Sequence, residues 1–300
     1  MLKKIVAGVD GRPGGADAAA LAAALAGPQT DVLLAGVYRD PLLPLPLTFG
    51  RDGEPREATE RMVGEVRDAH APRARTTAVC DSFPARALRH LAEREHADLL
   101  VLGSTHRARG GEAAIGRRAR QVLHDAPCPV ALAARDFAQE PGRPRRVVVG
   151  FDGSPEARAA LELAATLADG DGSRIVVVAV ADDRLPTVIM PTGVLVEMGE
   201  WEKIVDERRA RAERMLSRAA GDARRVLVGD PAEELASAAA GADLLVIGSR
   251  RWGALARVAV GSTGETLLRH APCSMLMVPR PADVEPAPAE EQMTAGRSER

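Results

Sequence analysis

An internal repeat constrains the fold of this chain more than any other feature. Residues 98–104 read Asp-Leu-Leu-Val-Leu-Gly-Ser, and residues 243–249 read Asp-Leu-Leu-Val-Ile-Gly-Ser, an offset of 145 residues. Ala-Pro-Cys recurs at 126–128 and 271–273 with the same offset, and Asp-Gly recurs at 10–11 and 152–153 with an offset of 142. The 300 residues therefore contain two copies of one unit, and one fold has to account for both.

Within each copy, short apolar runs alternate with helical segments. The run 244–247 ends at Gly248, which is typical of a buried strand in a parallel sheet. We expect strands at 4–9, 31–37, 76–79, 98–102 and 129–133, then at 146–151, 173–180, 224–228, 243–247 and 274–278. The expected helices are 13–26, 54–70, 84–95, 118–124, 155–167, 196–220, 232–240 and 263–270.

This alternation predicts an α/β fold with two tandem Rossmann-like domains. Each domain should hold a five-stranded parallel sheet with right-handed crossovers and helices on both faces. The expected bounds are 1–136 for the first domain, 137–145 for a Pro- and Gly-containing linker, and 146–280 for the second. The polar segment 281–300 should be a disordered tail. Because 129–133 and 274–278 are the last strands, we expect them to join the halves as a pseudo-twofold pair.

Composition limits the class of protein. Aromatic residues make up 2% of the chain, so the cores must be aliphatic, and the net charge of −2 provides no field that recruits nucleic acid. No apolar run is long enough to span a membrane and no signal peptide is recognisable, so a cytoplasmic location is expected. Three widely spaced cysteines, Cys80, Cys128 and Cys273, argue against a disulfide framework or zinc site. We expect Cys128 and Cys273 to be buried thiols.

The segment after the strand 243–247 carries the chemistry. Gly248 is followed by a loop of small and basic residues, and 261–264 read Gly-Ser-Thr-Gly ahead of a helix. Glycines let a ligand approach the backbone, and N–H groups and hydroxyls at a helix start suit an anion. We expect a phosphate cradle at the carboxyl end of this strand. The alternative is that Gly248 and Gly261 only end secondary structure elements.

These motifs resemble the universal stress protein family. Gly248-x-x-Arg251, nine residues, then Gly261-Ser262 is similar to the family's glycine-rich nucleotide loop. Residues 148–155 resemble its first strand with the following aspartate, and 268–273 resemble the segment before its last strand. The resemblance covers nearly all of 1–280 as a tandem pair. It implies the adenine nucleotide alpha hydrolase-like fold, ATP with or without Mg²⁺ as ligand in some members, and a role in stress tolerance without defined turnover.

The resemblance also implies binding residues. The aspartate after the first strand would contact the adenosine, and the glycine loop with its hydroxyls would hold the phosphates. Carried over to the second half, these positions are Asp152, Gly153, Val180, Ile247, Gly248, Arg250, Arg251, Gly261, Ser262, Thr263 and Gly264. A weaker site in the first half would comprise Asp10, Leu102, Gly103, Thr105, Gly116 and Arg117.

The chain departs from the family pattern in two ways. The second glycine of the motif is Arg251 in one half and His106 in the other. Arg117 and Arg118 stand where the second half has Ser262 and Thr263, and they either pair with phosphates or fill the pocket. The aspartates after the first strands also have a simpler interpretation as turn or helix-capping residues.

Three classes of function remain from the sequence. We see no Walker loop, no Ser-His-Asp arrangement and no carboxylate pair beside the phosphate loop. The chain is expected to be an ATP-binding regulatory protein of the stress response rather than an enzyme, with adenine nucleotide as partner and the two domains as an intramolecular pseudo-dimer. A nucleotide-independent interaction scaffold and a slow ATPase are the alternatives, and a homodimer of chains is left open.

Overall fold

The computed structural model describes residues 2–39, 55–124, 126–168, 172–184, 198–249 and 261–279. Arg250 and Arg251, which the sequence assigned to the binding loop, lie outside the described residues. The segment 281–300, expected to be a disordered tail, also lies outside them.

The expected strands and helices are present with small shifts of their ends. The first half contains β1 (Lys4–Val9), α1 (Pro13–Leu25), β2 (Asp31–Tyr38), α2 (Pro55–His70), β3 (Arg75–Cys80), α3 (Pro84–Arg94), β4 (Leu99–Gly103), α4 (Arg117–Leu123) and β5 (Val130–Ala133). A short 3₁₀ helix, η1 (Phe137–Gln139), follows. The second half contains β6 (Arg146–Gly150), α5 (Pro155–Leu167), β7 (Arg174–Ala181), α6 (Met198–Leu216), β8 (Ala223–Val228), α7 (Pro231–Ala238), β9 (Leu244–Gly248), α8 (Ser262–Leu267) and β10 (Ser274–Val278).

Two helices end earlier than the sequence predicted. The segment expected at 196–220 stops at Leu216, because the chain turns at Gly221, with φ +149°, to enter β8. The segment expected at 263–270 stops at Leu267, because the residues after it bond to the first half: Ala271 and Ala113 exchange backbone hydrogen bonds of 2.9 Å. A local turn therefore accounts for the first end, and contacts with the other half account for the second.

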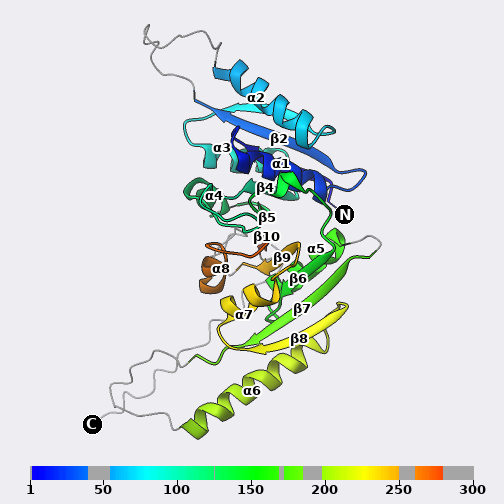
Figure 1. The fold of residues 1–300 in the computed structure, drawn as a ribbon, viewed down its shortest axis with the longest axis vertical. Helices are drawn as coiled ribbons and strands as arrows, with labels where there is room; N and C mark the ends of the chain where they lie inside the picture. Colours follow the sequence, from blue (N-terminus) through cyan, green and yellow to red (C-terminus); the bar gives the residue numbers. More distant parts are fainter. Residues whose placement is uncertain are drawn as a thin grey trace, which may run out of the picture.

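All ten strands of the described chain form one continuous sheet in the order β3-β2-β1-β4-β5-β10-β9-β6-β7-β8 (Figure 1). Every neighbouring pair is parallel except β5 and β10, which are antiparallel. Their register is centred on Ala131 opposite Leu276, two residues that occupy equivalent positions of the repeat. The expected joining of the halves through their last strands is confirmed.

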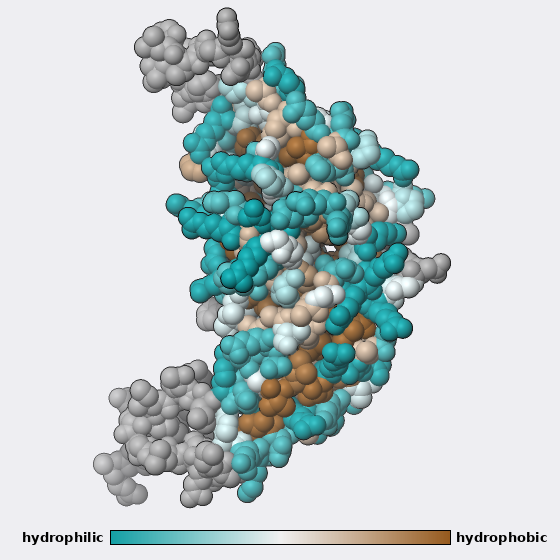
Figure 2. Space-filling view, in the orientation of Figure 1, coloured by the Kyte–Doolittle hydropathy of each residue, from teal (hydrophilic) through white to brown (hydrophobic). Residues whose placement is uncertain are grey.

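Helices cover both faces of the sheet in both halves. One apolar layer combines α1, α2, α5 and α6, and the other combines α3, α4, α7 and α8; each layer continues from one half into the other. Cys128 and Cys273 lie in the second layer with 6% and 4% exposure, and burial raises the pKa of each thiol to about 12. They are therefore buried thiols, as expected, while Cys80 is exposed. Figure 2 shows hydrophilic side chains over much of the first half and an apolar area near β7, β8 and α6.

An ion pair crosses between the halves at equivalent repeat positions. Arg120 on α4 and Glu265 on α8 lie 2.7 Å apart, and their residue numbers differ by the repeat offset of 145. Two first halves or two second halves joined in the same way would bring like charges together. The pair therefore favours joining of unlike halves over joining of like ones.

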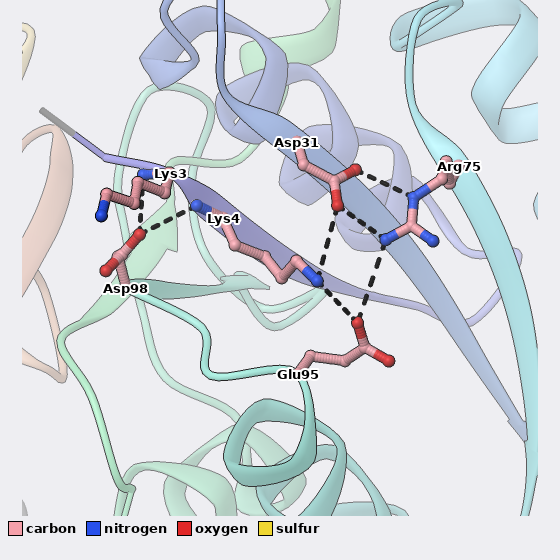
Figure 3. A network of polar contacts seen from close by, with 6 residues as sticks. All are labelled: Lys3, Lys4, Asp31, Arg75, Glu95 and Asp98. Atoms are coloured by element: carbon pink, nitrogen blue, oxygen red, sulfur yellow. Dashed lines mark hydrogen bonds and ion pairs between the residues drawn. The ribbon is translucent and has the colours of Figure 1, made fainter.

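A polar network fastens the amino ends of the strands in the first half (Figure 3). The Arg75 guanidinium donates two hydrogen bonds to Asp31, at 2.9 and 2.6 Å, and Lys4 Nζ lies 2.8 Å from Glu95. The Asp98 carboxylate accepts from the backbone N–H groups of Lys3 and Lys4. Its repeat equivalent, Asp243, accepts in the same way from the N–H groups of residues 145 and 146. The repeated aspartate therefore aligns the first strand with the fourth.

Asp17 connects the first half to the segment that follows it. Its carboxylate, 2% exposed on α1, accepts from the N–H groups of Asp136 and Ala138 at 3.1 and 2.9 Å. Burial raises the pKa of Asp17 against the opposing effect of these hydrogen bonds. The equivalent residue of the second half is Ala159, so this attachment belongs to the first half alone.

Candidate functional site

The second half has a cavity of about 700 Å³ where its sheet order changes direction. β6 lies between β7 and β9, so the loops after β6 and β9 diverge to opposite faces and leave a crevice at the carboxyl ends of the strands. This volume falls in the range that holds small-molecule ligands. The helices α5, α6, α7 and α8 contribute residues to its walls.

Most of the predicted second-half residues line this cavity. They are Asp152, Val180, Ile247, Gly248, Gly261, Thr263 and Gly264. Ser262 is exposed and does not belong to the lining, so Thr263 is the hydroxyl residue of this helix start that lines the cavity. Gly153 lines a neighbouring cavity of about 970 Å³ instead.

Two of the predicted glycines have structural reasons. A Cβ on Gly248 would lie 2.8 Å from the backbone carbon of Glu156, so the end of β9 packs directly on the start of α5. Gly153 has φ +76°, which favours glycine, and a Cβ there would lie 2.5 Å from Met215 Sδ. Gly261 differs from both, because its φ of −78° is open to any residue. A side chain at Gly261 would therefore act through the space it takes, not through backbone strain.

One carboxylate oxygen of Asp152 stabilises the turn after β6, as the interpretation of this aspartate as a turn residue predicts. Oδ1 accepts from the Ser154 N–H at 3.0 Å, and Asp10 Oδ1 accepts from the Arg12 N–H at 3.3 Å in the first half. Among the described residues, no hydrogen bond reaches Asp152 Oδ2, and Asp152 is exposed at the cavity. The carboxylate therefore shapes the turn and still has an acceptor for a ligand.

Ser249 is a cavity residue that the sequence reasoning missed. Its side chain is 3% exposed, and its Oγ has no hydrogen-bond partner in the described part of the chain. The equivalent Ser104 Oγ donates to the Ala133 carbonyl at 2.5 Å and accepts from the Ala114 N–H at 3.1 Å. A buried hydroxyl without a partner is unfavourable. Ser249 was visible in the repeat motif itself, although nothing in the motif distinguished it from Ser104.

Carboxylates besides Asp152 line the cavity, although the sequence showed no carboxylate pair beside the phosphate loop. Glu156 is 4% exposed in the first turn of α5, directly against Gly248, and the first half has Gly14 at this position. Asp182 is a second carboxylate, and a hydrogen bond from Arg184 lowers its pKa. Because the sequence separates Glu156 from the loop by several elements, only the packing of α5 on β9 reveals it.

Two arginines reach the cavity from α6. Arg208 donates to the Asp182 carbonyl, and its guanidinium carbon lies 5.2 Å from the centroid of the Trp201 ring. Arg211, one turn further along α6, also lines the cavity. The sequence predicted a helix at 196–220 without indicating which of its faces meets the site.

The first half has a corresponding cavity of about 630 Å³. All six predicted residues line it, namely Asp10, Leu102, Gly103, Thr105, Gly116 and Arg117. Arg117 and Arg118 are exposed at its wall, so their side chains leave the cavity open. A Cβ on Gly103 would lie 1.8 Å from the Gly14 carbonyl oxygen, so this glycine has the same structural reason as Gly248.

The described residues contain neither a membrane-spanning helix nor a cluster of metal-binding side chains. Within them, no helix combines the length and apolar character needed to cross a membrane. In the same part of the chain, no group of three or more His, Cys, Asp or Glu side chains is arranged to hold a metal ion.

The comparisons with known proteins agree with the repeat. The model of the universal stress protein family matches twice, at residues 1–133 and 144–279. A Thermus aquaticus protein described as the universal stress protein in the QAH/OAS sulfhydrylase 3' region is 32% identical over 144 residues, covering 45% of this chain and 98% of that protein.

Solved structures share the fold over nearly the whole chain. A universal stress protein from Archaeoglobus fulgidus aligns with a TM-score of 0.59 and 17% identity, covering 93% of this chain and 98% of that one. A Pseudomonas aeruginosa structure from the same family aligns with a TM-score of 0.62 and 16% identity, covering 93% and 94%. At these identities the likeness concerns the fold alone.

Proposed function

Because the chain belongs to the universal stress protein family and carries two copies of its domain, we propose that it is an ATP-binding regulatory protein of the stress response. Nucleotide binds mainly in the second-half cavity. The protein acts in the cytoplasm and does not need to turn over its ligand. The observation that carries this proposal is the buried Ser249 hydroxyl, which has no hydrogen-bond partner among the described residues and lies at a cavity of ligand size.

The lining of the second-half cavity fits an adenine nucleotide. Val178, Val180, Leu235 and Met277 make one part of the wall apolar, as a purine ring requires. Gly261, Thr263 and Ser249 make another part small and rich in hydroxyls, as a phosphate chain requires. Asp152 would accept from the ribose, and Arg208 and Arg211 would balance phosphate charge. Mg²⁺ would arrive on the phosphates, since the described residues give it no site of their own.

Titration calorimetry in excess Mg²⁺ tests where the nucleotide binds. The full chain should take up close to one ATP, because the first half has Arg117 and Arg118 in place of hydroxyl residues and Mg²⁺ already neutralises the phosphates that these arginines would bind. Two equal and tight sites would contradict a preference for the second half. No binding of any adenine nucleotide would leave the interaction scaffold as the better proposal.

Replacement of Ser249 by Ala should separate ligand binding from folding. The unliganded variant should be as stable as the parent or more so, because it removes a buried hydroxyl that has no partner among the described residues. ATP binding should weaken about tenfold, since a hydrogen bond of roughly 1.4 kcal/mol is lost. Thermal melting with and without ATP measures both effects.

Ser104→Ala is the matched control, because Ser104 occupies the equivalent position and its hydroxyl is hydrogen-bonded. This variant should lose stability and keep its ATP response. If Ser249→Ala instead lost stability and kept the full ATP response, its hydroxyl would serve the fold and not a ligand.

Slow ATP hydrolysis is a second candidate function, which the position of Glu156 favours. Glu156 lines the cavity with its Cβ packed against Gly248, and in this candidate function its carboxylate orients a water molecule at the phosphates. Phosphate release by the purified chain, compared with Glu156→Gln, distinguishes the two functions. Equal release from both proteins, at the level of the buffer, supports binding without turnover.

A further inference from the structure

Three arginines of the first half stand where the second half has hydroxyl residues. Arg12 is equivalent to Ser154, Arg117 to Ser262 and Arg118 to Thr263. We propose that Arg12, Arg117 and Arg118 make the first-half cavity a binding site for a metal-free oligophosphate chain, either inorganic or the tail of a nucleotide. This inference does not depend on nucleotide binding in the second half.

The fold brings the three arginines to one cavity. Arg12 follows β1 and immediately precedes α1, while Arg117 and Arg118 are the first two residues of α4, which follows β4. β1 and β4 are neighbours in the sheet, so their carboxyl ends open at the same place. All three residues line the cavity of about 630 Å³, and all three are exposed. Their guanidinium groups are therefore within reach of one ligand.

Within the described residues, these guanidinium groups have no other interaction partner. No ion pair or side-chain hydrogen bond there engages Arg12, Arg117 or Arg118. Arg135, a fourth arginine of the cavity, differs because it donates to the carbonyls of His106 and Ala108 and lies 3.6 Å from Asp136. Three arginines thus have their donors available, and the fourth is used by the fold.

The acidic residues of the cavity do not neutralise this cluster. Asp17 is buried and accepts two backbone N–H groups of the following segment. Asp10 is exposed and accepts from the backbone N–H of Arg12, so one carboxylate faces three guanidinium groups. The second half has Glu156 where the first has Gly14, so its cavity wall carries an additional carboxylate that the first lacks. The first-half cavity is therefore the one suited to a highly charged anion.

The chemistry of guanidinium selects the ligand class. A guanidinium group donates two parallel hydrogen bonds to phosphate oxygens, which a hydroxyl cannot do. Mg²⁺ binds the same oxygens and reduces the ligand charge, so the metal-free form should bind more tightly. The apolar wall at Val37, Leu88 and Leu102 leaves room for a base but is not needed for the phosphate contacts.

Calorimetry with inorganic tripolyphosphate in EDTA tests this proposal on the full chain. The parent should bind it at one site, and a variant with Arg12→Ser, Arg117→Ser and Arg118→Thr should bind roughly a hundredfold more weakly or worse. Excess Mg²⁺ should weaken binding to the parent. Because the three side chains are exposed, the variant should melt near the parent temperature, which checks its folding.

Arg107→Ser is the matched control. Arg107 is exposed on the loop between β4 and α4, before Arg117 and Arg118, but does not line the cavity. This variant should change the affinity less than threefold, about the effect of one distant surface charge. A repeat with ATP in EDTA on the parent and on the triple variant distinguishes the two sources. A site that the triple variant loses and that binds ATP much more tightly than tripolyphosphate identifies a nucleotide tail, and equal binding at that site identifies an inorganic chain. The proposal is overturned if the parent binds neither anion, if the triple variant binds as the parent does, or if Arg107→Ser loses as much affinity.

Discussion

A Gly261→Val variant should lose the stabilisation that ATP gives the parent protein. At 100 times its dissociation constant, ATP should raise the free energy of unfolding of the parent by roughly 2.7 kcal/mol. Gly261 lines the second-half cavity beside Thr263, so a valine side chain there would occupy the space proposed for phosphate. The increase in melting temperature with ATP, several degrees in the parent, should be absent in the variant.

The fold of this variant should survive. Gly261 has φ −78° and ψ 171°, an extended conformation that valine adopts without strain, and the residue is only half-buried. Gly142→Val is the matched control, because a Cβ at Gly142 meets no atom within 4 Å. This control should keep the full ATP response. Asp152→Ala should weaken binding less than Gly261→Val, since it removes one contact and leaves the phosphate space open.

A normal melting curve for Gly261→Val together with an undiminished ATP response would show that the phosphates do not lie at Gly261. Loss of the response in Gly142→Val as well would point to a general effect of added side chains. Either result would require another location for the nucleotide.

Gly103→Ala should destabilise the first half more than any other single methyl addition considered above. The added Cβ would lie 1.8 Å from the Gly14 carbonyl oxygen and 2.4 Å from the Gly14 carbonyl carbon. These are backbone atoms, so β4 and α1 would have to separate. We expect a loss of about 3 kcal/mol or more in the free energy of unfolding, at the upper end of overpacking effects. Urea denaturation followed by circular dichroism measures it.

Gly64→Ala is the control for this variant, because Gly64 lies within α2 and a Cβ there meets no atom within 4 Å. It should be stabilised by about 0.5–1 kcal/mol, since alanine favours a helix interior. If Gly103→Ala were as stable as the parent and lost only ligand binding, the glycine would serve the ligand and not the packing of α1.

The repeated seven-residue motif shows how far the sequence could be interpreted. Its apolar centre predicted a buried strand, which is confirmed as β4 and β9. Its two ends could not be assigned from sequence. Asp98 and Asp243 fix the start of a neighbouring strand, while Gly103 and Gly248 allow a helix to pack closely on the strand end. The hydrogen bonds of the aspartates and the close contacts of the glycines distinguish these roles. The local residue pattern specifies neither of them.

The two halves also show why equivalent residues differ in role. Ser104 and Ser249 occupy the same position of the motif, yet Ser104 is hydrogen-bonded to backbone groups and Ser249 has no partner among the described residues. Both partners of Ser104 come from other segments, so the local pattern that the two serines share does not determine their hydrogen bonds.

The sequence by itself determined that this chain is a tandem pair of α/β domains, because the repeat, the apolar runs and the alternation of periods are local and recur in order. Most of the site residues that the sequence selected also line the two cavities, because glycines and small polar residues after parallel strands mark one edge of the sheet. The tertiary structure decided the charge of each cavity. Glu156, Arg208 and Arg211 reach the second-half cavity through helix packing, and Arg12 lines the same cavity as Arg117 because β1 and β4 are neighbours. Strand order and helix orientation determine which residues far apart in the chain lie at the same cavity. No local sequence pattern specifies that order or orientation.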